Sequence, residues 1–343
     1  MKYEVILHYF ESSHLNQIYE GFARLDKSGI CNVRFKKTIG NAQKPLLLAQ
    51  INGKNVIYDT LDGLNWIDGK SLEENIQYFA TNNFDIDYYF KRSFTEDLYP
   101  YINNRFQYYP LGLNYDIHSI YSPLSLNKIK EKILRNKITE YFFGKRYFVA
   151  EDFVQAPIIN SESKILFLVR LWDPTPYRGS YLYDEWMQLN MKRIAYVKKC
   201  REKYGEQFIG GIKQDEFSMK MCSPDLILPE TMTRKQRFLE EVKKSNICIA
   251  TTGLHNSIGW KFAEYVAASR AIVTEPLNYR LPGNIAEESN YLEFIDEESL
   301  IKSIDRLLSD RTLLLKMMRC NHNYYLNNMQ PDKLILNTLL KIQ

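Results

Sequence analysis

The chain has few cysteines, and none is placed for a disulfide or a metal site. Its 343 residues include five of them, an odd number: Cys31, Cys200, Cys222, Cys248 and Cys320. No two stand at the close spacing of a zinc-binding pair, and together they do not form a disulfide framework. This scarcity argues against a disulfide-stabilised secreted scaffold and favours a reducing compartment.

Histidines are equally sparse, and two familiar motifs are missing. The five histidines are His8, His14, His118, His255 and His322. None of them pairs with a second His or a Cys at ligand spacing, so we predict no zinc site. The chain also has neither the Gly-x-Ser-x-Gly sequence of serine hydrolases nor a Walker phosphate-binding sequence.

A strong excess of one charge and long apolar runs are also absent. The formal net charge is only +4, which argues against a nucleic-acid binder driven by phosphate neutralisation. No apolar run approaches the roughly 20 residues of a membrane span. The first residues, MKYEVILHYF, enter a predicted strand without the apolar core or cleavage site of a signal peptide. We expect a cytoplasmic protein, with peripheral contact at the inner face of the membrane left open.

What the sequence does contain is a strand–loop–helix–strand unit in its second half. The apolar run Ile247–Ala250 leads into a loop, and a helix of about three turns then precedes a second apolar run, 271–274. Gly253 and Gly259 allow the loop backbone to approach a ligand, and Ser257 is predicted to cap the helix. Because free N–H groups and the positive dipole end would face that ligand, the loop favours an anion.

Two charged residues of this helix, Lys261 and Glu264, stand three positions apart and therefore share a face. A carboxylate near a phosphate-binding helix start is well placed to accept a hydrogen bond from a ribose hydroxyl. The alternative is a surface ion pair between the two side chains, which would contribute about 0.2–0.5 kcal/mol.

The segment FAEYVAASRAIVTEP, residues 262–276, resembles the donor-binding segment of GT-B-fold glycosyltransferases that use nucleotide sugars. Many of these enzymes carry two glutamates separated by seven residues. Glu264 matches the second glutamate, which the resemblance makes the ribose-binding carboxylate, whereas the first position holds Asn256. The resemblance implies an α/β fold of two Rossmann-like domains facing across a cleft, with a C-terminal helix that returns to the N-terminal domain.

A second basic element follows the apolar run Ile165–Leu171. Arg170 and Arg178 would lie at the carboxyl end of this predicted parallel strand, where open α/β sheets bind ligands. Guanidinium groups match diphosphate oxygens, and the segment resembles the basic loop of the GT-B donor domain, with Arg178 in place of the usual lysine. The alternative for Arg170 is a structural ion pair with Asp173.

Two histidines are candidates for contact with the substrates. His255 lies in the anion loop, where contact with a phosphate or the donor sugar and a purely structural role are equally supported. His14 lies at the first strand–helix turn and is the candidate base that takes the proton of an acceptor hydroxyl. Its alternative is a capping or surface residue.

Three further stretches are less specific. The first two each have two interpretations, and the third has one. The aromatic residues between 88 and 121 either stack on sugars or, as we favour, fill the core of the N-terminal domain. The basic helix predicted at Tyr181–Tyr204 either has a solvated face or is attracted to an anionic membrane. Leu126–Phe142 is predicted to be helical.

Two local signals stand in the N-terminal half. An amphipathic helix is predicted from about His14 to Leu25, with Ser12 or Ser13 as its cap and Ile18, Phe22 and Leu25 as its apolar stripe. Asn52-Gly53 is predicted to form the turn between two paired strands.

The predicted domains are an acceptor-side α/β domain at residues 1–155, a donor-binding domain at 156–325 and a returning helix at 326–343. The resemblance implies a glycosyltransferase of cell-surface polysaccharide or glycoconjugate synthesis. It would use a nucleotide sugar as substrate rather than as cofactor, and a saccharide or lipid-linked saccharide as acceptor. Because the arginines and the helix dipole would stabilise the leaving diphosphate, we expect no metal to be needed. A nucleotide-sugar epimerase and a non-catalytic nucleotide-sugar-binding protein remain alternatives. The predicted donor-binding residues are Arg170, Arg178, Gly253, His255, Asn256, Ser257, Lys261 and Glu264.

Overall fold

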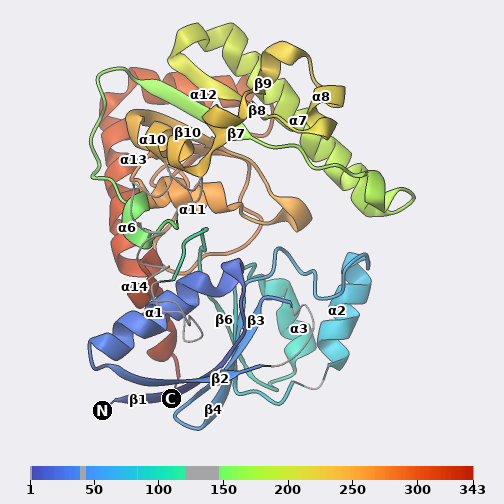
Figure 1. Ribbon diagram of the computed structural model, residues 1–343, viewed down its shortest axis with the longest axis vertical. Helices are drawn as coiled ribbons and strands as arrows, with labels where there is room; N and C mark the ends of the chain where they lie inside the picture. Colours follow the sequence, from blue (N-terminus) through green and yellow to red (C-terminus); the bar gives the residue numbers. More distant parts are fainter. Residues whose placement is uncertain (1, 39–43, 83, 120–146, 343) are drawn as a thin grey trace.

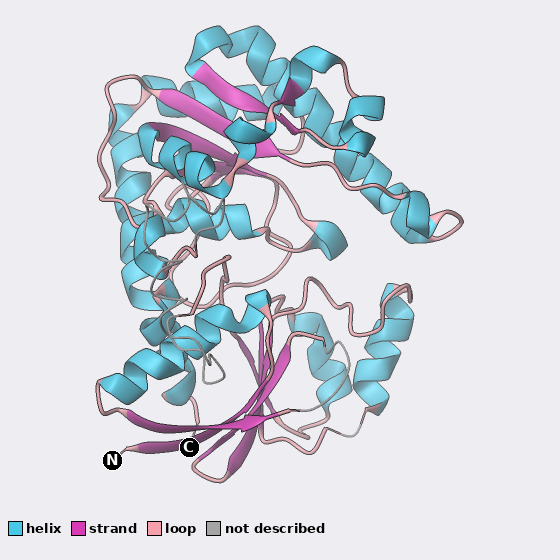
Figure 2. Ribbon diagram, in the orientation of Figure 1, coloured by secondary structure: helices cyan, strands magenta, loops and turns pink. Residues whose placement is uncertain are grey.

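The protein consists of two α/β domains placed one above the other (Figure 1). This computed structural model describes residues 2–38, 44–82, 84–119 and 147–342. Each domain contains one six-stranded sheet, and Figure 2 shows these two groups of strands well separated. The predicted fold class, α/β with two domains, is confirmed.

The N-terminal sheet is mixed. Its strand order is β2-β1-β3-β4-β5-β6, in which only β3 runs antiparallel to both of its neighbours. The strands are β1 (Tyr3–Tyr9), β2 (Cys31–Lys37), β3 (Leu46–Ile51), β4 (Lys54–Asp59), β5 (Tyr88–Lys91) and β6 (Gln107–Pro110). The predicted Asn52-Gly53 turn joins β3 to β4, with φ at 49° and 84° as a two-residue hairpin turn requires.

Three helices accompany this sheet: α1 (Asn16–Lys27), α2 (Leu72–Thr81) and α3 (Tyr99–Ile102). The predicted stripe of α1 is confirmed, since Ile18, Phe22 and Leu25 are buried in one cluster with β1. The predicted cap by Ser12 or Ser13 is wrong, because a short 3-10 turn precedes α1 and the cap residue is Leu15. The described aromatic residues of β5 and β6 are mostly buried, so the core interpretation of this stretch holds.

The C-terminal sheet is parallel throughout, with the order β12-β11-β10-β7-β8-β9. Its strands are β7 (Lys164–Val169), β8 (Phe208–Lys213), β9 (Ile227–Leu228), β10 (Ser245–Ala250), β11 (Ala271–Thr274) and β12 (Leu292–Glu293). This is the order of a doubly wound nucleotide-binding sheet. The strand order reverses between β7 and β10, and ligands of such sheets bind at the carboxyl ends of the strands at that point.

The helices of this domain pack on both faces of the sheet, as the two separate core clusters on either side of β7 and β10 indicate. They are α6 (Ala150–Phe153), α7 (Tyr181–Tyr204), α8 (Glu216–Met221), α9 (Glu230–Thr233), α10 (Lys235–Lys244), α11 (Trp260–Ala267), α12 (Glu297–Ser309) and α13 (Arg311–Tyr324). The predicted range of α7 is confirmed. Helix α11 has eight residues and is therefore shorter than the three turns predicted.

The described parts of the chain cross between the domains at two points. Core residues up to Leu111 pack with the N-terminal sheet, whereas residues from Leu113 pack with the C-terminal domain. After α13, a π-helical turn (Tyr325–Met329) leads to α14 (Pro331–Leu339), which packs against α1 beside the N-terminal domain (Figure 1). The Tyr58 and Thr338 hydroxyls are 2.9 Å apart and bind α14 to β4.

The helix predicted at Leu126–Phe142 lies largely outside the described residues. None of the described helices combines the length and the apolar character that crossing a bilayer requires.

Candidate functional site

A cavity of about 490 Å³ lies between the domains, at the carboxyl ends of β7 and β10. We call it the interdomain cavity. Six cationic side chains and three carboxylates line it, which leaves an excess of three positive charges. These residues are Arg92, Arg170, Arg193, Lys213, Lys235 and Lys261, with Asp62, Asp116 and Glu264. The switch point of the parallel sheet therefore carries a cationic cavity, as binding of an anionic ligand requires.

The loop after β10 forms one wall, and four of its N–H groups already have partners. The N–H of Thr252 donates to Glu275 Oε2 at 2.8 Å, and that of His255 donates to Glu185 Oε1 at 2.7 Å. Those of Gly253 and Ser257 donate to carbonyls within the loop. In the first turn of α11, the N–H of Phe262 donates to the carbonyl of Gly259 at 3.1 Å, and the N–H groups of Trp260 and Lys261, which precede it, are left for a ligand.

The predicted cap of this helix is wrong, although the two residues concerned do line the cavity. The cap residue of α11 is Gly259, and no side chain caps the helix. Ser257 instead packs against Gly253, where a Cβ atom would come within 2.6 Å of Ser257 Oγ. Gly253 is therefore needed for the tight loop, and both residues face the interdomain cavity.

Lys261 and Glu264 each have another partner, so the alternative of a surface pair between them is wrong. Glu264 is 2% exposed and forms an ion pair with Lys235 at the start of α10. Lys261 reaches back to β7 and donates to the carbonyl oxygen of Leu168. Burial lowers the pKa of Lys261 to about 7, with Glu264 opposing the shift and nearby cations adding to it. An anion in the cavity would therefore favour the charged form of this lysine.

Arg170 stands free of ion pairs within the described chain. Its guanidinium carbon lies 3.6 Å from the centre of the Trp172 ring, a cation–π contact that orients it beside the cavity. The predicted alternative, an ion pair with Asp173, is wrong, because Asp173 accepts from the N–H of Thr175. Arg178 is exposed and does not line the interdomain cavity.

A second arginine in the cavity, Arg193, was missed by the sequence analysis. We expected it on the solvated face of α7, but it is 8% exposed. Its guanidinium donates to the carbonyl oxygens of Arg170 at 2.8 Å and Thr252 at 3.2 Å. Arg193 thus joins the ends of β7 and β10 at the switch point. Burial lowers its pKa to about 10, so it stays charged at neutral pH.

The N-terminal domain supplies the opposite wall. His14 lies 4.7 Å, between ring centres, from Trp260 of α11, and its Nδ1 is buried without a partner in the described chain. Burial lowers the pKa of His14, and Asp62 only partly offsets this. Burial alone would raise the pKa of Asp62, but Arg92 and His14 outweigh it, so the carboxylate is ionised. His14 is therefore neutral at pH 7 and lies beside a fixed negative charge.

Arg92 joins the two domains at this point. It is 4% exposed, forms an ion pair with Asp62 and donates to the carbonyl oxygen of Ile258 in the C-terminal domain. Neither Arg92 nor Asp62 belongs to a recognisable motif, and the residues approach each other only through the fold. No sequence signal singles them out.

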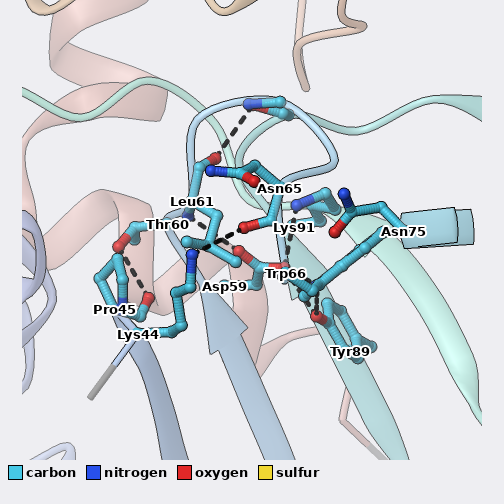
Figure 3. Close-up of polar contacts among 12 residues, drawn as sticks. Lys44, Pro45, Asp59, Thr60, Leu61, Asn65, Trp66, Asn75, Tyr89 and Lys91 are labelled. Carbon is cyan, nitrogen blue, oxygen red and sulfur yellow. Dashed lines mark hydrogen bonds and ion pairs between the residues drawn. The ribbon is translucent and has the colours of Figure 1, made fainter. Parts of the chain in front are cut away.

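A fully buried polar cluster lies at the ends of β4 and β5 (Figure 3). Asp59 at the end of β4 pairs with Lys91 at the end of β5, with 2.9 Å between Oδ2 and Nζ, and both side chains are 0% exposed. Tyr89 and Trp66 also donate to Asp59 Oδ2, at 2.6 and 3.0 Å. The cluster fixes the ends of two strands from which Asp62 and Arg92 extend into the cavity.

Besides Arg178, two predicted donor-binding residues lie outside the interdomain cavity. His255 and Asn256 adopt left-handed backbone conformations, with φ at 55° and 57°. His255 packs against Gly63 of the N-terminal domain, and its carbonyl accepts from Tyr279 at 3.0 Å. Asn256 lines a neighbouring cavity on the other side of the loop. Neither residue lines the interdomain cavity.

The described residues contain no group of three or more His, Cys, Asp or Glu side chains that could hold a metal ion.

No family model matches the chain, and no curated protein matches its sequence. Among solved structures, the chain is similar to WaaG, a glycosyltransferase involved in lipopolysaccharide biosynthesis, with 10% identity, coverage of 98% and 97% of the two chains and a TM-score of 0.43. It is also similar to HepE of Anabaena in complex with UDP, with 10% identity, coverage of 96% and 95% and a TM-score of 0.36.

A third similar structure is that of TarM, with 11% identity and a TM-score of 0.43. The alignment covers 80% of this chain and 47% of TarM, so the chain spans about half of that protein's length. At such identities and TM-scores, these structures assign no role to any residue of the chain.

Proposed function

We propose that the protein is a glycosyltransferase that moves a sugar from a nucleotide sugar to an acceptor hydroxyl. The observation that carries the proposal is the interdomain cavity: a cationic site at the switch point of a parallel sheet, beside a helix N-terminus and a buried carboxylate. A diphosphate matches the cations and the helix start, and a ribose matches Glu264. We also propose that the acceptor is a saccharide or lipid-linked saccharide of cell-surface polysaccharide or glycoconjugate synthesis.

The donor-side residues have separate roles in this proposal. Arg170, oriented by Trp172, and the first turn of α11 bind the diphosphate, while Lys261 adds a charge that the anion stabilises. Arg193 is a positioning residue, because its guanidinium binds the carbonyls that hold the two loops in place. Glu264, held by Lys235, accepts a hydrogen bond from the ribose.

The chemical step follows from the charges of the cavity. As the bond between the sugar and the diphosphate breaks, negative charge grows on the leaving diphosphate, and the fixed cations stabilise it without reorganisation. On the N-terminal side, neutral His14 takes the proton of the acceptor hydroxyl as that oxygen attacks the sugar carbon. Arg170, Lys261 and the helix dipole supply the positive charge that a metal ion supplies in other phosphate sites.

A transfer assay tests the function. The protein is incubated with radiolabelled nucleotide sugars, with and without a panel of saccharide acceptors, and the products are separated. Transfer of label to an acceptor supports the proposal. Epimerised donor or unreacted donor with intact binding would replace it with one of the two alternatives.

Metal independence is tested in the same assay. Because protein cations neutralise the diphosphate, we expect EDTA to leave the transfer rate unchanged. A complete loss of transfer that Mg²⁺ or Mn²⁺ restores would show that the cations of the cavity are insufficient.

Glu264→Gln keeps the shape of the side chain but removes its charge. We expect the Kd for the donor to rise about 10- to 100-fold, since a hydrogen bond to a charged group contributes about 1.5–3 kcal/mol. Isothermal titration measures this. Glu241→Gln is the matched control, because Glu241 is also a buried, paired glutamate but belongs to α10 outside the cavity. Equal Kd values for wild type and Glu264→Gln would remove Glu264 from the donor site.

The pH dependence of kcat/KM tests His14. A base acts in its neutral form, and the pKa of His14 lies below its usual value of 6.5 because the side chain is buried. We therefore expect the acidic side of the pH profile to lie below pH 6.5, with activity falling as the pH drops through that lowered pKa. The His14→Gln variant should lose this fall in activity at low pH, while the His255→Gln variant should keep it. If the fall in activity at low pH persists unchanged in His14→Gln, another group is the base.

A further inference from the structure

A second cavity, of about 310 Å³, lies on the other side of the loop after β10. We call it the flanking cavity. Its volume falls within the range of small-molecule sites. Four exposed or half-exposed polar side chains from three segments of the chain converge on it: Gln188 and Lys192 of α7, Asn256 of the loop and Asn278 after β11. The exposed side chain of Ile295 adds an apolar patch.

The charge of this cavity differs from that of the interdomain cavity. Glu185, Glu275 and Lys192 line it, so carboxylates outnumber cations by one, whereas the interdomain cavity has an excess of three positive charges. A diphosphate is therefore repelled from the flanking cavity and attracted to the other one. Amides, carboxylates and one ammonium group instead match a neutral or amino-bearing ligand with several hydroxyl groups.

The two cavities share the wall that separates them. Thr252 and Gly253 line both of them. The carboxylates of the flanking cavity also hold this wall, since Glu275 accepts from the N–H of Thr252 and Glu185 accepts from that of His255. An occupant that contacts these carboxylates therefore also contacts the support of the loop beside the proposed diphosphate.

The flanking cavity also lies near the boundary between the domains. At the start of α7, the Tyr181 hydroxyl donates to the carbonyl of Lys70 in the N-terminal domain at 2.8 Å. Shortly after Asn278, the N–H of Arg280 donates to the carbonyl of Phe94 in that domain at 2.9 Å. The cavity thus lies beside two bridges to the N-terminal domain, which the proposed function makes the acceptor side.

We propose that the flanking cavity is a saccharide-binding subsite that holds a sugar unit of the acceptor remote from the reacting hydroxyl. This inference rests on the proposed function. Gln188 and Asn278 donate to and accept from the hydroxyl groups of that unit, Glu185 accepts from them, and Ile295 packs on its C–H face. The subsite selects an uncharged or amino sugar, and it rejects a phosphorylated one.

Saturation-transfer NMR on the full chain tests the subsite. The probes are glucose, N-acetylglucosamine, glucosamine and their β-linked disaccharides, and UDP, GDP and ADP are titrated separately by calorimetry. We expect at least one sugar to bind the wild-type protein. Asn278→Leu, a change at an exposed position, should weaken that binding at least 10-fold and leave the Kd of the nucleotide unchanged. Arg170→Ala should raise the Kd of the nucleotide and leave sugar binding unchanged.

These measurements distinguish failure of the saccharide subsite from failure of the proposed glycosyltransferase function. Sugar binding that Asn278→Leu and Gln188→Leu leave unchanged, or no binding of any probe sugar, overturns the subsite. Equal binding of glucose and glucose 6-phosphate also overturns it, since the excess carboxylate should reject the phosphate. Failure of all three nucleotides to bind contradicts the proposed function, whereas sugar binding weakened by Asn278→Leu would still support a saccharide site.

Discussion

Arg170→Ala should lower kcat about 100-fold or more, while the melting temperature stays within error of the wild type. Removal of one preorganised charge donor from a developing anion costs a factor of about 10²–10³ in kcat. Arg170 is suited to this role because its guanidinium stacks on Trp172 and makes no ion pair within the described chain. Its contribution to stability is therefore small, and its effect should appear in kcat more than in donor affinity.

Arg170→Lys and Arg178→Ala complete the experiment. The lysine retains the charge but loses the planar fork and the stack on Trp172, so we expect only partial recovery of kcat. Arg178 is exposed and outside the cavity, which makes Arg178→Ala the matched control with wild-type turnover. Wild-type kcat in Arg170→Ala would contradict the diphosphate role, and a large fall in melting temperature would indicate a structural one.

Lys91→Ala should reduce the free energy of unfolding by about 3–5 kcal/mol, because it leaves a buried charge without its partner. Asp59 and Lys91 are both 0% exposed, and Asp59 keeps only neutral donors once the lysine is gone (Figure 3). Urea denaturation followed by tryptophan fluorescence measures the change. Turnover should also fall, since the cluster fixes the strand ends that carry Asp62 and Arg92.

Lys70→Ala is the control for this prediction. Lys70 forms an ion pair with Glu74 at 2.8 Å, but about half of each side chain is exposed to solvent. Because water screens that pair, the urea midpoint should not move measurably. The double variant Asp59→Leu/Lys91→Met should be more stable than Lys91→Ala, as it leaves no unpaired charge. A change of less than about 1 kcal/mol in Lys91→Ala would show that the cluster is not a buried ion pair.

Local sequence patterns predicted much of the secondary structure. The apolar run of β7, the strands that flank the loop, the range of α7 and the Asn52-Gly53 turn all follow from periodicity or turn chemistry, and the structure confirms them. These features depend on neighbours within a few residues, so the sequence contains the necessary information. The alternation of apolar strands with helices likewise predicted the parallel sheet of the C-terminal domain.

Capping and loop chemistry were predicted less well. Ser257 has the right residue type for a cap, but the loop turns back at His255 and Asn256, and Gly259 takes the cap position. The left-handed conformation of two consecutive residues depends on Glu185 and Tyr279, which lie far away in the sequence. A prediction from neighbouring residues alone cannot take such distant partners into account.

The residues of the candidate site show most clearly what could not be predicted from the sequence. The sequence by itself singled out Arg170, Lys261, Glu264 and His14, because each stands at the end of a strand or in the loop and helix that follow one. Only the tertiary structure brought in Arg193 and Lys235 as well as the N-terminal pair Asp62–Arg92. Their charges are ordinary in a sequence with 25% charged residues. They became part of a site because two domains meet there and partly bury them. Partial burial lowers the effective dielectric and so strengthens the interactions of each charge, and no local sequence pattern reports such burial.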